Sequence, residues 1–91
     1  MAISKKTRDK VWDKAKPVRG KDPDKYRQDP YGNVLHYDSY GKDSGMGWEI
    51  DHIKPAARGG SDATRNLQAL KTSVNRDKGD SLVKRSRHSQ N

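Results

Sequence analysis

Large apolar side chains are sparse along this chain, and their spacing predicts a few short elements. Ser4 is a suitable N-cap for a helix over about residues 5–16, in which Trp12 is the largest apolar residue. Pro17 favours an end near Lys16, because proline disfavours helical geometry at the residue before it. We therefore expect Trp12 to anchor an N-terminal helix to the core.

The middle of the chain alternates between turn residues and short apolar runs. Gly32 and Asn33 precede the run 34–37, and this pattern is typical of a β-hairpin. Three glycines between residues 38 and 47 indicate a loop. The loop leads into a strand over 48–53, in which apolar residues recur with the period of two that places them on one face.

Pro55 ends that strand and begins a surface loop that turns at residues 59–60. Residues 67–70 form the next expected strand, and a helix over about 72–78 follows it. Gly79 is suited to the C′ position after this helix. Strands and helices in this order predict the α+β class.

The composition limits how large a core the chain builds. It has 91 residues, of which 29% are hydrophobic and 35% charged, and it has no Phe. This length fits one domain, expected over 1–80, with a basic flexible tail over 81–91. A core that small is marginal by itself. The chain has no cysteine, which excludes disulfides and cysteine-based zinc sites.

The net charge of +8 and the pI of about 9.9 favour a polyanionic partner such as nucleic acid. The alternative is that this charge only keeps a small protein soluble. An apolar segment is missing after Met1, and no long apolar run follows, so the sequence predicts neither a secretory signal nor a membrane span. We expect a cytoplasmic protein.

Three polar side chains are the candidates for chemistry. His52 has a side chain whose ordinary pKa is near neutrality, so it is suited to accept a proton from water. Asp51 and Asn75 offer oxygen ligands of the kind that Mg²⁺ or Mn²⁺ prefers. Neighbours in a regular strand face opposite ways. We therefore expect the strand to end at this point and let Asp51 and His52 converge. Taken alone, His52 and Asn75 are each better explained by an ordinary surface or core role, and the alternative for Asp51 is a solvated acid at a strand end.

The residues around this set are suited to support it. Asn66 is expected to hold loop backbone near His52 through its side-chain amide. Lys71, Asn75 and Lys78 are spaced i, i+4, i+7, which predicts a shared helix face, while Val74 points to the core. A solvated charged face explains the lysines equally well.

These motifs in this order resemble the HNH endonuclease family, whose site is a ββα-metal finger (His-Me finger). The resemblance covers residues 48–79 and is carried by Asp51-His52-Ile53 with Pro55, Gly59-Gly60-Ser61-Asp62, Asn66-Leu67 and Asn75-x-x-Lys78-Gly79. Residues 12–41 also resemble small stand-alone members, with Tyr26-Arg27-x-Asp29 as the most informative part. We therefore expect a finger preceded by an N-terminal helix and a short hairpin, encoded by a bacterium or phage.

The resemblance implies a role for each residue. His52 is the catalytic general base, Asn66 is the structural asparagine of the catalytic motif, and Asp51 and Asn75 hold one divalent metal ion. Asn75 stands where the literal motif has its last histidine, so Mg²⁺ is favoured, Mn²⁺ is possible, and no structural zinc is expected. The implied activity is hydrolysis of DNA phosphodiester bonds, most readily in double-stranded DNA, with low sequence specificity. The alternative is a non-catalytic nucleic-acid-binding protein with a degenerate finger.

Basic residues near the finger are expected to contact the DNA backbone. Contacts of this kind position a substrate without reading its sequence. For Arg27, a structural pairing with Asp29 or Asp38 is slightly favoured over contact with the scissile phosphate. The expected nucleic-acid-binding residues are Arg27, Lys54, Arg58, Arg65, Lys71, Arg76 and Lys78.

Overall fold

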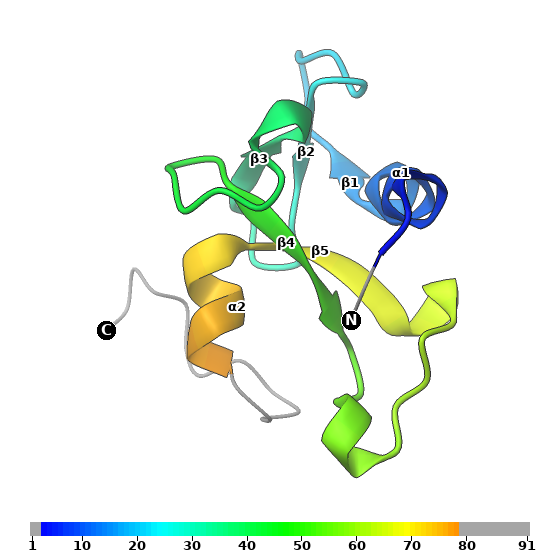
Figure 1. Cartoon of the computed structure of the whole chain (residues 1–91). Coiled ribbons are helices and arrows are strands. Elements are labelled where there is room, and N and C mark those ends of the chain that lie inside the picture. The colour runs from blue at the N-terminus through cyan, green and yellow to red at the C-terminus, as the bar shows by residue number, and fades with distance from the viewer. Residues whose placement is uncertain (1–2, 79–91) are drawn as a thin grey trace.

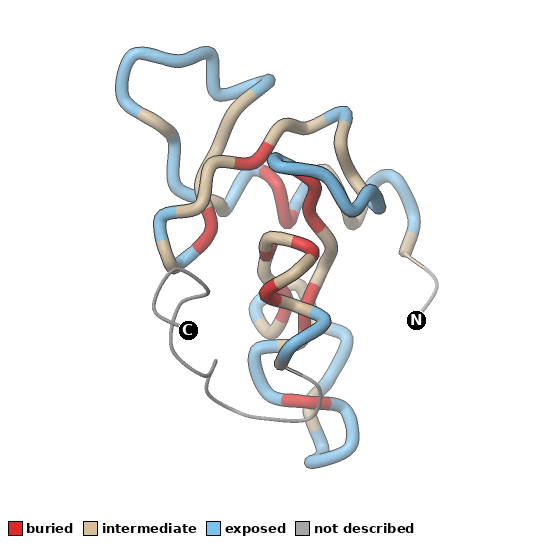
Figure 2. The backbone as a smooth tube through the Cα atoms, turned by 90° about the vertical axis from the view of Figure 1, so that its left-hand side faces the viewer, coloured by how far each residue is buried: buried red, intermediate tan, exposed pale blue. Residues whose placement is uncertain are grey.

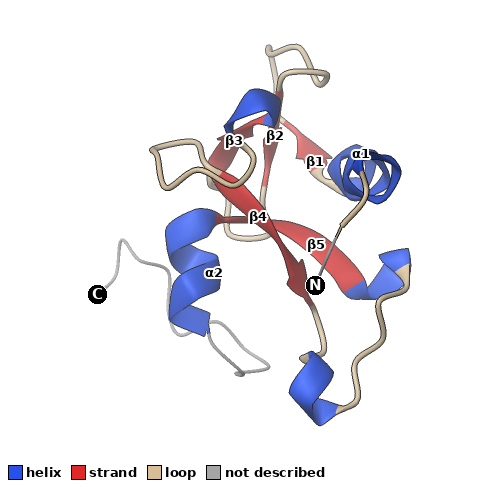
Figure 3. Cartoon of the chain, viewed as in Figure 1, coloured by secondary structure: helices blue, strands red, loops and turns tan. Residues whose placement is uncertain are grey.

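The computed structural model describes residues 3–78, with the side chain of Lys78 excepted. The predicted closing glycine at 79 and the predicted flexible tail over 81–91 lie outside this range. Helices lie around two small antiparallel sheets (Figure 1), and Figure 3 distinguishes these elements from the loops. The elements are α1 (Lys5–Lys14), β1 (Lys16–Pro17), β2 (Tyr26–Gln28), β3 (Val34–His36), β4 (Trp48–His52), β5 (Leu67–Lys71) and α2 (Thr72–Lys78).

Helix α1 begins as predicted but ends two residues early. The Ser4 side chain caps its first turn by accepting from the Thr7 amide. The helix ends at Lys14 rather than Lys16, because the next residues are extended and Lys16 pairs with Gln28 in a strand. The two-residue strand β1 was not predicted. None of the helices within residues 3–78 has the length and apolar character needed to cross a bilayer.

The predicted hairpin is present, and it forms the larger sheet together with β1, in the order β1-β2-β3. Gly32 adopts a φ of 85° in the turn, a left-handed conformation that favours glycine. Strands β4 and β5 form a second sheet of their own, with Trp48 opposite Lys71 and His52 opposite Leu67. The α+β prediction is therefore confirmed, and β4, β5 and α2 follow one another in the strand-strand-helix order that the sequence predicts.

The β4–β5 sheet separates two different environments. Directly opposed residues of an antiparallel pair project to the same side, so its residues divide into two faces. The α1 face consists of Trp48, Ile50, His52, Leu67, Ala69 and Lys71, and its apolar residues pack into the main core with Val11 and Trp12 of α1. The α2 face lies towards α2 and consists of Glu49, Asp51, Gln68 and Leu70.

Because the chain has no Phe, rings of Trp and Tyr supply the aromatic part of the core on the α1 face. The rings of Trp12 and Trp48 lie 5.0 Å apart, and those of Tyr40 and Trp48 lie 4.8 Å apart. Trp48 is completely buried, and its indole N–H donates to the carbonyl oxygen of Tyr37. In Figure 2 the buried positions recur along the central elements, while much of the loop after β4 is exposed.

Candidate active site

Asp51 is a largely buried carboxylate on the α2 face. Only 7% of the residue is exposed, and Gln68, directly opposite on β5, donates from its side-chain Nε2 to Asp51 Oδ2 at 2.9 Å. A buried carboxylate needs hydrogen-bond donors or a cation to offset its desolvation. The register of the sheet thus supplies one donor to the carboxylate that the sequence predicts to be a metal ligand.

Asn75 is held beside the same face by Glu49. The Asn75 side-chain Nδ2 donates to Glu49 Oε1 at 3.0 Å, and Glu49 precedes Asp51 by two residues. Residues two apart in a strand project to the same face, so Glu49 brings the Asn75 amide to the face that carries Asp51. An ionised carboxylate only accepts hydrogen bonds. Glu49 therefore selects the amide orientation in which Nδ2 faces it and Oδ1 is turned to another direction.

Arg76 completes the group around Glu49. Its guanidinium approaches Glu49 Oε2 at 3.3 Å and Asp43 Oδ2 at 3.6 Å. This positive charge is partly exposed, so it offsets the charge of Glu49 only modestly. Arg76, one of the predicted nucleic-acid contacts, is thus engaged with carboxylates at the edge of the α2 face.

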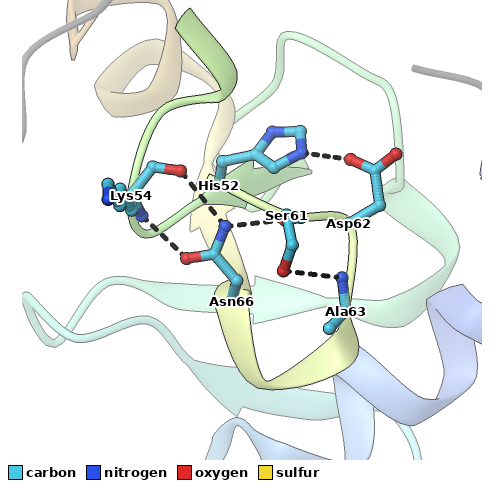
Figure 4. Close-up of polar contacts among 6 residues, drawn as sticks. All are labelled: His52, Lys54, Ser61, Asp62, Ala63 and Asn66. Carbon is cyan, nitrogen blue, oxygen red and sulfur yellow. Dashed lines mark hydrogen bonds and ion pairs between the residues drawn. The ribbon is translucent and has the colours of Figure 1, made fainter. Parts of the chain in front are cut away.

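His52 stands at the end of β4 with an acidic partner from the following loop. Its ring Nε2 lies 2.7 Å from Asp62 Oδ1, as Figure 4 shows. Because a carboxylate accepts, Nε2 is the donor, and in the neutral imidazole the lone pair then resides on Nδ1. The Asp62 side chain is 72% exposed and that of His52 only 18%, so the pair lies at the protein surface. Asp62 orients the ring and sets its tautomer.

Asn66 fastens the loop that carries Asp62. Its Oδ1 accepts from the Lys54 amide at 2.9 Å, and its Nδ2 donates to the carbonyl oxygens of Lys54 and Ser61 at 3.1 and 2.7 Å (Figure 4). The sequence predicts this backbone-holding role, and the three bonds confirm it. The bonds join the end of β4 to the returning loop, which brings Asp62 to His52.

A glycine pair allows this loop to turn so closely. Gly59 has a φ of 88°, in the left-handed region. At Gly60 a Cβ atom would lie only 1.7 Å from the carbonyl oxygen of Lys54. Only glycine fits against that backbone, so residues 59–60 are required for the geometry that pairs His52 with Asp62.

The prediction that the strand ends at Asp51 and His52, so that the two side chains converge, is wrong. The ladder continues through His52, pairing Asp51 with Gln68 and His52 with Leu67, and the strand ends at His52 rather than at 53. In a regular ladder these neighbouring side chains start from opposite faces. Asp51 lies on the α2 face, against which Glu49 holds Asn75, whereas His52 is directed to Asp62 at the end of the strand.

The predicted nucleic-acid-binding residues fall into two groups. Lys54, Arg58 and Arg65 are exposed in the segment between β4 and β5, which follows His52 in the chain. Lys71 is the last residue of β5 and donates to the Gly45 carbonyl oxygen, so its predicted place on a helix face with Asn75 is wrong. The helix begins only at Thr72.

Arg27 has a structural position, with partners other than those predicted. Its Nε donates to the Pro23 carbonyl oxygen, and its Nη1 donates to those of Asp13 and Ala15, each at 2.9–3.0 Å. Among residues 3–78 no ion pair joins it to Asp29 or Asp38. The last carbonyls of a helix lack intrahelical donors, and Arg27 supplies donors at the end of α1.

Two residues of the site were not assigned roles from the sequence. Glu49 was detectable, because a period of two places it on the face of Asp51. Asp62 belongs to the quoted Gly-Gly-Ser-Asp motif, but it lies ten positions after His52, and no local pattern predicts that contact.

The resemblance implies a divalent metal ion, so the side chains around Asp51 must offer oxygen ligands to it. Within residues 3–78 no group of three or more His, Cys, Asp or Glu side chains is arranged to hold a metal ion. Asp51 and the Asn75 amide offer two oxygen donors instead, and the orientation set by Glu49 turns the amide oxygen away from the competing carboxylate. Few protein oxygens, completed by water and phosphate, are the usual coordination of Mg²⁺. The residues fit such an ion.

The fold and the site define a small basic α+β protein with a ββα segment and a histidine-acid pair at the end of its first strand. A family model described as HNH endonuclease matches residues 43–83, a little under half of the chain. The resemblance of this segment to the HNH endonuclease family is thereby confirmed. Comparison with curated proteins gave no match, and comparison with solved structures gave none either.

Proposed function

We propose that this protein is a metal-dependent DNA endonuclease that hydrolyses phosphodiester bonds with low sequence specificity. The observation that carries the proposal is the Asp62-oriented His52 next to Asp51, within the segment that matches the HNH endonuclease model. The net charge of +8 suits a nucleic-acid substrate. The ββα elements are then a metal finger in the sense of that family.

His52 is the proposed general base. With its Nε2 hydrogen donated to Asp62, the neutral ring accepts a proton at Nδ1 from the attacking water. The resulting imidazolium is stabilised by the carboxylate at 2.7 Å, as in other histidine-acid pairs. Asn66 supports this step by holding the loop that carries Asp62.

Asp51 and Asn75 are the proposed metal ligands. A bound Mg²⁺, or Mn²⁺ in its place, supplies Lewis-acid stabilisation of the charge that develops on the phosphate and the leaving oxygen. Gln68 holds the Asp51 carboxylate, and Glu49 directs the Asn75 amide. Lys54, Arg58 and Arg65 are exposed in the segment that follows His52 and are suited to hold the backbone of double-stranded DNA.

The test is incubation of supercoiled plasmid with the protein in Mg²⁺ or Mn²⁺. We expect cleavage that EDTA abolishes and that His52→Ala lowers by about 10²–10⁴-fold, the usual contribution of a general base. The variant should keep its affinity for DNA, because a base contributes little to ground-state binding. Circular dichroism of the variant checks that it folds.

The second candidate, a non-catalytic DNA-binding protein, is favoured by the basic charge alone. It predicts plasmid that is shifted in a gel but never cut in either metal. A His52→Ala variant that cleaves as fast as the unmodified chain would remove His52 from the reaction.

A further inference from the structure

A cavity of about 510 Å³ lies along the edge of β5 that faces away from β4. Its walls come from the end of α1, the start of β1, the turn between β2 and β3, and β5 itself. Pockets that hold small organic groups usually have volumes of this order. The catalytic scheme above leaves this cavity without a role.

Two residues of the cavity lining also adjoin the candidate active site. Gln68 lines the cavity and also donates to Asp51 at 2.9 Å. Ile53 lines it and directly follows His52 in the chain. A nucleic-acid strand with one phosphate at Asp51 and His52 would therefore carry the adjoining nucleotide to this cavity.

The lining combines an aromatic ring with amides that have unused hydrogen-bonding capacity. Tyr31 lies in one wall, and aromatic side chains are the usual stacking partners of unpaired bases. Gln28 and Gln68 also line the cavity, and each uses its side-chain Nε2 on a protein acceptor, Pro17 O at 3.1 Å for Gln28. Their amide oxygens remain as acceptors of the kind that base amino groups need.

The acidic residue in the wall is satisfied by the protein. Asp29 is 97% buried, since only 3% of it is exposed. Its carboxylate accepts from the amides of Tyr31 and Asn33 at 2.9 Å, from the Asn33 side chain at 3.0 Å, and from the Lys71 amide at 3.1 Å. Four N–H donors offset its charge, so it opposes a nucleotide less than an unpaired carboxylate would.

Lys14 adds a cation to the wall of the cavity. The Lys14 ammonium donates to the carbonyl oxygens of Thr64 and Leu67, and it has three N–H donors in all. Burial lowers the pKa of Lys14. Burial, together with the charges of Asp29 and Asp51, raises the pKa of Tyr31, so the active-site carboxylate is within electrostatic reach of the cavity.

We propose that this cavity is a nucleoside subsite, which receives the base and sugar of an unpaired nucleotide next to the scissile phosphate. Tyr31 stacks on the base, the amide oxygens of Gln28 and Gln68 accept from its edge, and Lys14 donates to the ligand. The proposal rests on the proposed function, because that function places a phosphate beside the cavity. It implies that double-stranded DNA is locally distorted where it binds, so that one base leaves the stack of the helix and enters the cavity.

Binding is tested in EDTA on the whole chain, so that cleavage plays no part. Deoxyadenosine 5′-monophosphate, deoxyadenosine and inorganic phosphate are titrated separately while amide signals are followed by NMR. We expect the nucleotide and the nucleoside to shift the amides of Tyr31, Gly32, Gln68 and Ala69, and phosphate alone to leave them in place. Shifts produced only by phosphate, or no shift from the nucleoside at about 10 mM, would overturn the subsite.

Matched variants identify the residues responsible. Tyr31→Ala should weaken binding of the nucleotide about 10-fold, while Tyr31→Phe, which keeps the ring, should change it less than about 3-fold. Lys14→Met should weaken it more than Lys10→Met, which removes the same charge from an exposed position of α1 outside the cavity. Equal affinity in Tyr31→Ala and the unmodified chain would overturn the stacking role.

The plasmid assay separates the two proposals. Cleavage by a chain that binds no nucleoside would leave the nuclease proposal standing and remove the subsite. Nucleoside binding by a chain that cleaves no DNA would do the reverse.

Discussion

The two faces of the β4–β5 sheet differ in composition, because one carries buried apolar residues and the other carries hydrogen-bonded polar residues. The α1 face places Trp48, Leu67 and Ala69 in a core where they are at most 3% exposed. The α2 face places Glu49, Asp51 and Gln68 side by side, and Glu49 joins this face to α2 by accepting hydrogen bonds from Asn75 and Arg76. One face thus stabilises the fold by burial, and the other holds polar groups that stability alone does not require.

The difference shows how a chain with so few apolar residues supports a polar site. The period of two in a strand allows one short sheet to contribute to a core and to a candidate active site at once. Leu70 and Val74 add a small buried contact on the α2 side, each at most 3% exposed. The polar groups are therefore fixed by the same strands that carry the aromatic core.

The largest effect is expected from Trp48→Ala. Removing a fully buried tryptophan should lower the free energy of unfolding by about 3–5 kcal/mol, through lost burial and the cavity left behind. Glu49→Ala, one residue away on the other face, should cost less than about 1 kcal/mol, since its carboxylate is partly exposed. Urea unfolding measures both values. Similar losses in the two variants would show that the faces do not differ in this way.

A smaller effect, confined to the α2 face, is expected from Glu49→Gln. A glutamine amide both donates and accepts, so it no longer selects one orientation of the Asn75 amide. Affinity for Mn²⁺ should fall about 10-fold, the usual range for residues that orient metal ligands, with little change in stability. Isothermal titration with Mn²⁺ measures this.

Asp43→Asn is the matched control for that experiment. It removes the other carboxylate near Arg76 without touching Asn75. If both variants bind Mn²⁺ as tightly as the unmodified chain, Glu49 does not act through the Asn75 amide.

Much of this comparison was accessible from the sequence, and the failures have a common cause. The cap at Ser4, the shared face of Trp48 and Ile50, and the loop-holding bonds of Asn66 follow from local patterns. The contacts of Arg27 with the end of α1 and of Glu49 with Asn75 join residues 12–26 positions apart. Such pairings depend on how elements pack, and no local pattern encodes them.

The same reasoning explains the two backbone errors. Strand β1 is only two residues long and contains a proline, so no alternation of apolar and polar residues predicts it. The convergence of Asp51 and His52 was expected from a strand that ends early, but cross-strand pairing with Leu67 extends the ladder through His52. The sequence identified the residues of the site better than the directions in which they point.

The smallest effect is expected at the rim of the packed side, from Asp9→Asn. The Asp9 carboxylate accepts from the Lys5 ammonium at 2.7 Å and from the Tyr37 hydroxyl. The hydrogen bond from Lys5, followed by that from Tyr37, lowers the pKa of Asp9 below its ordinary 3.8. A carboxyl with a lowered folded-state pKa stabilises the fold above its unfolded-state pKa, and this contribution is lost as the pH falls through the folded-state value.

The Asn variant should therefore melt slightly below the unmodified chain at about pH 7, and the difference should vanish as the pH falls through the folded-state pKa of Asp9. Thermal unfolding across this range measures it, with Asp13→Asn as the control, because the Asp13 side chain makes no hydrogen bond or ion pair within residues 3–78. If the two chains still differ in melting temperature when Asp9 is protonated, the effect of Asp9→Asn comes from altered packing or hydrogen bonding rather than from lost charge. A difference as large as that of Trp48→Ala would mean that the α1 side depends on charge as much as on burial.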